Sequence, residues 1–219
     1  MPENSTNLIE TVRKALGRTA PLAAAPVPPM LDEALIRLVQ PGANLVETFI
    51  KAATEAKFKV ETAAASNICS KLVEFIKSQN CKRIGFPVSD LLQRLNVPAA
   101  LKDAGITAQS WDELTLDSAY DLDCGVTDVY TAVAETGSLV IRADPKHGRA
   151  LSLLPPIHIA IIEPANLVPD LIDLFEQFAR QTPTPAFTLI TGPSKTADIE
   201  GSLVTGVHGP GLVKLFVLI

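Results

Sequence analysis

The sequence predicts an α/β protein in which a mixed, mostly parallel β-sheet is flanked by helices. Amphipathic helical segments alternate with short apolar runs between residues 42 and 110. Residues 157–162 form a nearly continuous apolar run, which is typical of a parallel strand buried on both faces. Together these two patterns favour a doubly wound fold, in which ligands bind at the carboxyl ends of strands.

The N-terminal part is expected to be separate from this sheet. Residues 5–16 predict an amphipathic helix, because their apolar side chains share one face and Gly17 ends the segment. Residues 19–30 contain four prolines among alanines, and proline disrupts both helices and sheet ladders. We therefore expect a helix and an extended linker over residues 1–30, followed by a single α/β domain over residues 31–219.

The expected elements of this domain follow from periodicity and from turn residues. After a helical pattern that starts at Leu31, helices are predicted over residues 42–57, 66–77, 89–95 and 169–180. Strands are predicted over residues 58–62, 83–87, 106–110, 138–142, 157–162, 186–190 and 213–219.

Composition excludes several functional classes. The formal net charge is -5 and the 19 basic residues are scattered, so nucleic acid is not an expected partner. No apolar run is long enough to span a membrane and no signal sequence is evident, so we expect a cytoplasmic protein. Cys69, Cys81 and Cys124 are far apart and form no Cys-x-x-Cys pair, which favours free thiols over a metal or iron–sulfur site.

The segment that follows the strand at residues 186–190 is the strongest candidate site. It reads Thr191-Gly-Pro-Ser-Lys-Thr-Ala-Asp-Ile-Glu200. Gly192 allows a tight exit from the strand, and Ser194 or Thr196 is expected to cap a short helical turn whose free N–H groups bind an anion. Lys195 adds a positive charge, and Asp198 or Glu200 is a candidate base. The spacing does not match a Walker A loop, so a P-loop nucleotidase is not predicted.

A second glycine-rich segment adds an ionisable group. Gly206-Val-His-Gly-Pro-Gly211 places His208 between flexible residues, with Gly206 and Gly209 as candidate ligand-binding positions. A histidine that only makes structural hydrogen bonds is the alternative.

A third segment precedes the strand at residues 138–142. Its turn, Glu135-Thr136-Gly137-Ser138, offers a candidate catalytic carboxylate, two hydroxyls and a glycine that permits close approach of a ligand. A plain turn with a solvated glutamate is an equal alternative.

Two further polar features are given structural interpretations. The loop at residues 142–149 contains Arg142, Asp144 and His147 and is expected to be a charged surface loop, although it could also bind an anion. His158 lies within an apolar strand and is expected to be a buried histidine with a hydrogen-bond partner.

Four separated blocks, taken together, resemble the LUD-domain family, of the lactate utilization protein C type. They are residues 134–140, residues 152–159, the block at residues 190–200 and the block at residues 206–210, and they occur in the family's order. The resemblance implies a fold similar to the NagB/RpiA/CoA-transferase group. It also implies a role in oxidising L-lactate to pyruvate with two partner proteins that carry iron–sulfur clusters, and no cofactor in this chain. Lys195 stands where the family pattern has arginine, which keeps the charge but loses the planar fork that grips a carboxylate.

Three functions therefore remain open from the sequence. The first is a component of an L-lactate-oxidising system that binds a small anion such as lactate. The second is a stand-alone enzyme acting on a phosphorylated, folate-like or CoA-linked molecule, with Glu135 or Glu200 as nucleophile or base. The third is a non-catalytic assembly protein that uses its N-terminal helix and linker.

Overall fold

The protein consists of two units, which comprise residues 1–36 and 37–219. The computed structural model describes residues 3–18, 27, 29, 36–40, 42–180, 184–197 and 203–219. The first unit contains helix α1 (Glu3–Ala15), which confirms the helix expected over residues 5–16. The expected linker and the helical pattern that starts at Leu31 lie almost entirely outside the described residues.

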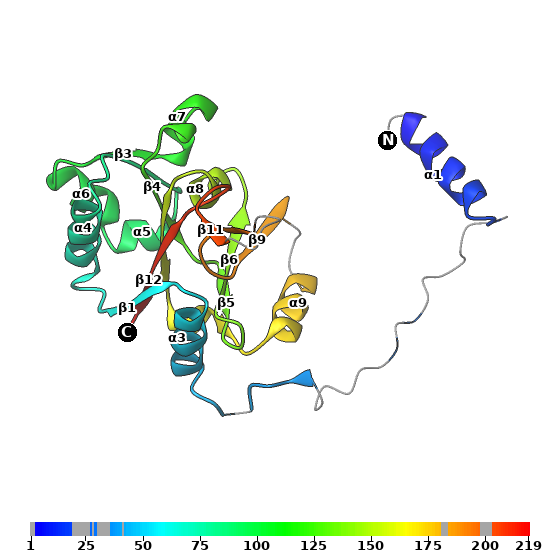
Figure 1. The fold of residues 1–219 in the computed structure, drawn as a ribbon, viewed down its shortest axis with the longest axis horizontal. Helices are drawn as coiled ribbons and strands as arrows, with labels where there is room; N and C mark the ends of the chain where they lie inside the picture. The colour runs from blue at the N-terminus through cyan, green and yellow to red at the C-terminus, as the bar shows by residue number, and fades with distance from the viewer. Residues whose placement is uncertain are drawn as a thin grey trace. The chain divides into compact units, whose positions relative to one another are not determined.

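The second unit is built around a six-stranded parallel sheet (Figure 1). Its order is β1 (Lys59–Ala63), β12 (Leu212–Leu218), β7 (Ile157–Ile162), β4 (Cys124–Asp128), β2 (Arg83–Phe86) and β3 (Thr107–Ser110). Every neighbouring pair in this sheet is parallel. The predicted α/β class is therefore confirmed. Strand β4 lies in the interior of the sheet, in a segment for which we predicted no strand.

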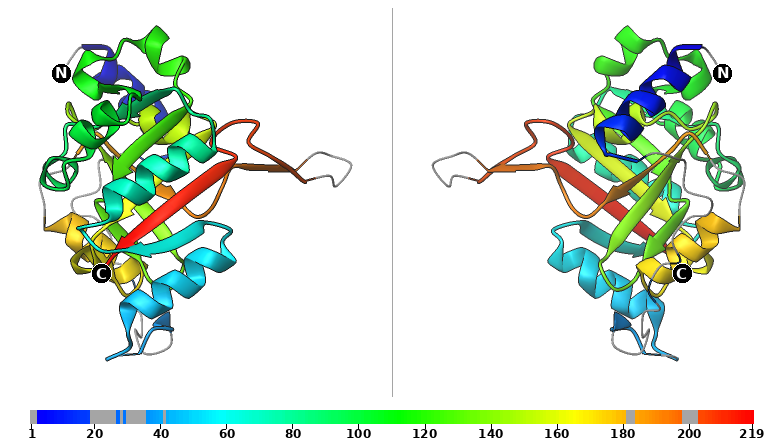
Figure 2. Two further views of the ribbon diagram at one scale, coloured as in Figure 1. Left: turned by 90° about the vertical axis from the view of Figure 1, so that its left-hand side faces the viewer. Right: turned by 90° about the vertical axis from the view of Figure 1, so that its right-hand side faces the viewer.

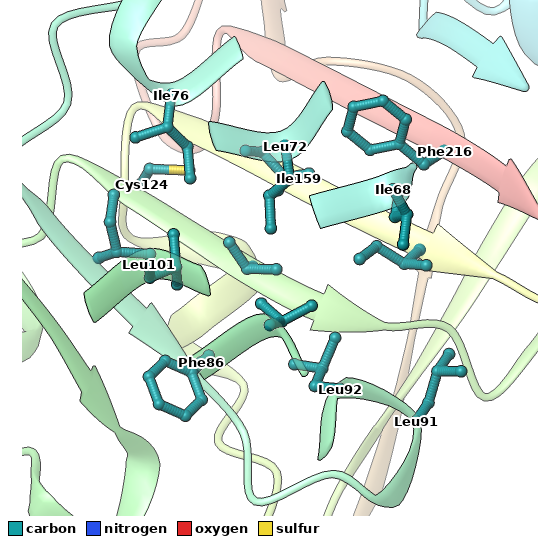
Figure 3. Packing of buried hydrophobic residues seen from close by; sticks show 14 of the residues in the cluster. Ile68, Leu72, Ile76, Phe86, Leu91, Leu92, Leu101, Cys124, Ile159 and Phe216 are labelled. Carbon is teal, nitrogen blue, oxygen red and sulfur yellow. The ribbon is translucent and has the colours of Figure 1, made fainter. Parts of the chain in front are cut away.

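Helices α4 (Ile68–Ser78), α5 (Asp90–Arg94) and α6 (Val97–Asp103) cover one face of this sheet. Their apolar side chains meet those of alternate strand residues in one buried cluster (Figure 3). Ile159 and Phe216 point into this cluster, because successive strand residues face opposite sides of a sheet.

The opposite face is covered by helix α3 (Leu45–Glu55) and by a second sheet. The second sheet has the order β8 (Leu167–Val168), β5 (Thr131–Val133), β6 (Ser138–Ala143) and β9 (Ala186–Ile190). Strands β6 and β9, which we predicted from their apolar runs, pair here antiparallel to each other rather than in the large sheet. Helix α9 (Leu171–Ala179) packs on the outer side of the second sheet through Leu174.

The sequence explains where helices α3 and α9 begin. Asn44 caps α3 by accepting a hydrogen bond from the Glu47 N–H at 3.3 Å. Asp170 caps α9 by accepting from the N–H groups of Ile172 and Asp173 at 2.9 and 3.1 Å. Its other oxygen pairs with Arg37 at 2.8 Å. One buried carboxylate therefore holds both the start of α9 and Arg37, the first residue of the second unit.

The remaining elements are short. They are the 3₁₀ turns η1 (Trp111–Glu113) and η2 (Pro164–Asn166), helices α7 (Leu116–Tyr120) and α8 (Ala150–Leu153), and a ribbon of β10 (Lys195–Ala197) and β11 (Leu203–Thr205). The ribbon extends away from the two sheets (Figure 2). Within the described part of the chain, no helix has the length and apolar character needed to cross a membrane.

Candidate functional site

The two glycine-rich segments of the C-terminal part meet at the base of the β10–β11 ribbon. The Ser194 N–H donates to the Pro210 carbonyl at 2.8 Å, and the Gly206 N–H donates to the Ser194 carbonyl at 2.9 Å. The Gly211 N–H donates to the Pro156 carbonyl at 3.0 Å. These bonds join the loop after β9, the loop before β12 and the turn before β7.

A cavity of about 250 Å³ lies beside this junction. Its polar lining consists of Ser152, Thr188, Thr191, Ser194 and His208, together with the backbone of Gly192 and Gly209. Among the described residues that line it there is no lysine, arginine or carboxylate. The cavity therefore offers hydroxyl groups, backbone groups and one imidazole.

The cavity lies at the amino ends of the central strands, whereas we expected a ligand site at carboxyl ends. Ser152 precedes β7 and His208 precedes β12. The reason is that β9, which leads into the candidate loop, belongs to the second sheet and runs antiparallel to β6. Its carboxyl end does not coincide with the carboxyl edge of the large sheet.

The expected helical turn at Ser194 is wrong, because the following residues form strand β10. Lys195 and Thr196 pair with Thr205 and Val204. The N–H group of Ser194 is used in closing the loop, so a helix N-terminus with free donors does not form there. Lys195 is exposed and Thr196 is half-buried, and neither lines the cavity. Asp198 and Glu200 lie outside the described residues.

The turn before β6 is connected to the cavity by a chain of hydroxyl groups. Thr136 Oγ1 and Ser138 Oγ are 2.7 Å apart, and Ser138 Oγ is 2.7 Å from Thr191 Oγ1, which lines the cavity. Glu135 is half-buried, and its N–H donates to the Pro169 carbonyl at 3.0 Å. Glu135 is not part of the cavity lining, so the structure brings together Thr191, Ser194 and His208 but not Glu135.

Two of the candidate glycines are explained by packing against helix α3. Gly137 has φ +66°, and a Cβ there would lie 2.3 Å from the Ala53 nitrogen. Gly192 has φ +106°, and its Cβ would lie 2.3 Å from the Ala56 oxygen. Both positions need glycine for close backbone approach as well as for the positive φ.

The loop at residues 142–149 was expected to be a charged surface loop, and this interpretation is wrong for His147. Its side chain is buried, and Nδ1 lies 2.8 Å from Asp144 Oδ1. Burial raises the pKa of Asp144, but the hydrogen bonds from His147 and the Lys146 N–H outweigh this, so the pKa lies below its ordinary value. Gly148 allows the loop to pack directly against the Trp111 ring, because a Cβ there would lie 2.2 Å from ring atoms.

Asp128 is a polar residue of this region that the sequence did not single out. It is the last residue of β4 and faces His147, with 3.6 Å between Asp128 Oδ1 and His147 Nε2. The sequence pattern that could have identified Asp128 is a carboxylate directly after the buried run Val126-Thr127. Such a carboxylate marks the carboxyl end of a strand.

His158 is fully buried, as expected. Its Nε2 is 2.8 Å from Thr127 Oγ1, and no described residue pairs with Nδ1. Burial lowers its pKa to about 4, because the charged form loses its solvation.

The three cysteines form no disulfide bond. Cys69 is half-buried, and Cys81 and Cys124 are buried. In the part of the chain that the structure describes, no group of three His, Cys, Asp or Glu side chains is arranged to hold a metal ion.

The protein is thus of the α/β class, with a parallel central sheet and a cavity lined in part by loop residues. The family model of the LUD domain matches residues 46–218. The chain therefore belongs to the LUD domain family.

Relatives with curated names agree with this family. The chain is 38% identical over 117 residues to lactate utilization protein C of Bacillus velezensis, a match that covers 49% of this chain and 48% of that protein. It is 29% identical over 189 residues to lactate utilization protein C 1 of Bacillus mycoides, covering 82% of this chain and 76% of that protein. The chain thus spans about half the length of the first of these relatives.

A solved structure supports the fold. A DUF162 family protein from Deinococcus radiodurans matches with a TM-score of 0.60 and 22% sequence identity, over 80% of this chain and 96% of that protein. At this identity the likeness concerns the fold alone.

Proposed function

We propose that this protein is a component of an L-lactate utilization system, which oxidises L-lactate to pyruvate together with iron–sulfur partner proteins. The names of its relatives, lactate utilization protein C, support this role. In this proposal the chain binds a small anionic ligand such as lactate and contributes to an active site shared with its partners.

The observation that carries the proposal is the cavity beside Ser194 and His208. Its volume of about 250 Å³ lies below the roughly 300–1,000 Å³ of sites for drug-sized ligands, so it suits a metabolite as small as lactate. The hydroxyl groups of Thr188, Thr191 and Ser194 are hydrogen-bond partners for a 2-hydroxy acid. His208, when protonated, supplies the positive charge that a carboxylate needs.

The ribbon has a different role in this proposal. Lys195 and Thr196 lie on β10 and outside the cavity lining, so we assign them to a surface that meets a partner's site. Asp198 and Glu200 follow in the sequence, and their proposed roles as acid or base, like that of Glu135, depend on the sequence pattern.

Binding is tested by isothermal titration of the full chain with L-lactate. Propionate, which lacks the hydroxyl group, serves as the comparison ligand. The variants are Ser194→Ala and His208→Gln, and the matched control is Ser78→Ala on the exposed end of α4. Loss of one neutral hydrogen bond is worth about 0.5–1.5 kcal/mol, so Ser194→Ala should weaken binding by about 2–12-fold. Equal affinities for wild type and Ser194→Ala would argue against this cavity.

The cellular role is tested by deleting the gene from the organism that carries it. Growth on L-lactate as the carbon source should be lost and should return with the wild-type gene. Unimpaired growth of the deletion strain would exclude the lactate role. If the wild-type gene restores growth and the His208→Gln gene does not, the cellular role depends on the cavity.

A further inference from the structure

The topology of the large sheet marks a second place where a ligand is expected. From β2 the chain continues to β3 on one side, and from β4 it continues towards β7 on the other side. The strand order therefore reverses between β2 and β4. Doubly wound sheets bind ligands in the crevice at the carboxyl ends of such a pair. In this protein Pro87 and Asp128 lie at these two ends.

A cluster of ionisable side chains fills this position. Asp144 Oδ1 accepts hydrogen bonds from the N–H groups of Lys146 and His147 at 2.8 and 3.0 Å, which fixes the carboxylate. The same oxygen lies 2.8 Å from His147 Nδ1. Since a carboxylate only accepts hydrogen bonds, this contact places the hydrogen of the neutral ring on Nδ1. Nε2 is then the nitrogen that gains or loses a proton.

The Nε2 side of His147 faces two groups from other strands. Arg142 Nη2 lies at 3.4 Å and Asp128 Oδ1 at 3.6 Å. Asp128 Oδ1 is buried and has no hydrogen-bond partner among the described residues. A separation of 3.6 Å is too long for a direct hydrogen bond, and polar contacts of this length are commonly bridged by water.

A cavity with room for one water molecule lies beside these side chains. The cavity has a volume of about 10 Å³ and is lined by Asp128, Arg142 and His147, together with apolar atoms of Ile141 and Leu151. About 10–15 Å³ is the smallest volume that holds a water, which also needs two to four polar partners. Gly148, whose backbone packs against the Trp111 ring, also lines this cavity.

We propose that Asp128 and His147 bind one water molecule between them and form a proton-transfer site at the carboxyl end of β4. Asp144 positions His147 by holding its Nδ1 hydrogen, and the water takes the place of Arg142 as the hydrogen-bond partner of Nε2. The water donates one hydrogen bond to Asp128 Oδ1 and a second to Nε2 of the neutral imidazole. When His147 is protonated, its Nε2 proton passes to the water as a water proton passes to Asp128, so the water is regenerated. This site is independent of the cavity beside His208.

The first test is a crystal structure of the full chain at a resolution that shows ordered water. One water within hydrogen-bonding distance of both Asp128 Oδ1 and His147 Nε2 is the expected result. A direct bond between these two atoms, or no water between them, would overturn the proposal.

The second test measures the charge coupling between Asp128 and His147. Imidazole ¹⁵N chemical shifts give the fraction of His147 that is protonated at each pH in wild type and in Asp128→Asn. The charged groups that face this ring are Asp128, Asp144 and Arg142, with Tyr130 beside Arg142. Removing one facing carboxylate should lower the ratio of protonated to neutral His147 by about tenfold.

The matched control is Asp112→Asn in the exposed turn η1, which should leave the ratio unchanged. An unchanged ratio in Asp128→Asn would overturn the coupling. If Asp128→Asn does not fold, as judged by circular dichroism, the wild-type crystal structure decides the question alone.

Discussion

At the scale of single residues, the contact between Gly137 and helix α3 sets a strict limit on side-chain size. We predict that Gly137→Ala destabilises the protein by about 3 kcal/mol, of which roughly 1–2 kcal/mol reflects the left-handed backbone and the rest the collision with Ala53. Urea unfolding followed by circular dichroism measures the loss.

Gly105→Ala is the matched control for this substitution. Gly105 has a similar φ of +72°, but a Cβ there meets no atom within 4 Å. We expect it to lose only about 1 kcal/mol, from backbone strain alone. Equal losses in the two variants would show that the approach of Gly137 to α3 contributes nothing to stability.

His158 makes stability depend on pH near neutrality. Its pKa is lowered to about 4 in the folded protein, against 6.5 for a free imidazole. Between these values the unfolded chain binds a proton that the folded chain does not, so the free energy of unfolding falls as the pH falls. We predict a loss of about 2 kcal/mol between pH 7 and pH 5 from this residue.

The variant His158→Gln should remove most of this slope, even if its stability at pH 7 is lower. His208→Gln, which changes an exposed histidine, should keep the slope of wild type. The pKa values of Glu61, Asp123 and Asp144 are also lowered in the folded protein. Protonation of these carboxylates in acid therefore reduces the free energy of unfolding too, but mainly below pH 5. A slope in His158→Gln equal to that of wild type would contradict the prediction.

At the scale of elements, helix α9 depends on one buried carboxylate. Asp170 caps the helix and pairs with Arg37, so Asp170→Ala removes the cap and one of the ion pairs of Arg37. We expect a loss of about 3 kcal/mol in urea unfolding. Asp170→Asn keeps an acceptor for the cap and should lose less.

Thr115→Ala provides the comparison at an exposed cap. Thr115 caps α7 by accepting from the Ser118 N–H at 3.1 Å and has no charged partner in the described hydrogen-bond pattern. We expect it to cost about 1 kcal/mol. If Asp170→Ala cost no more than Thr115→Ala, the pairing with Arg37 would contribute nothing.

The elements also show which parts of the fold the sequence could predict. Helices α3, α4 and α9 were predicted because their apolar residues repeat with helical periodicity and capping residues precede α3 and α9. Strand β4 was missed because Gly125, Thr127 and Asp128 interrupt its apolar pattern. These residues suit the strand only in its tertiary setting, where Gly125 admits the Leu151 carbonyl and Thr127 bonds His158.

The candidate site was also predictable only in part, because local sequence patterns identify loops but not the tertiary contacts that join them. The glycine-rich loops were identified from local turn chemistry, and the structure brings Ser194 and His208 to one cavity. The helical turn at Ser194 was wrong because β11, eight residues further along the chain, provides a pairing partner for β10. The contact between Asp128 and His147 depends on the packing of two separate segments, and no local pattern reports it.

At the scale of the whole molecule, unit 37–219 contains its own hydrophobic core. Every buried hydrophobic residue among those described lies between Phe49 and Leu218. In α1, by contrast, Leu8, Ile9 and Val12 are exposed, as is Leu16 directly after the helix. A helix of 13 residues with an exposed apolar face has little stability of its own, because isolated helices of this length are marginal in water.

We therefore predict that residues 37–219 fold with the urea midpoint and m-value of the full chain. Arg37 must be kept, because it pairs with Asp170 and Asp173 at 2.8 and 2.6 Å. The matched comparison is Arg37→Ala in the full chain, which should lower the midpoint although residues 1–36 are present. A large fall in the midpoint on removing residues 1–36 with Arg37 retained would show that α1 stabilises the core. An unchanged midpoint would leave the exposed apolar face of α1 free to bind a partner. Pull-down with the iron–sulfur proteins that we propose as partners, using both chain lengths, tests that association.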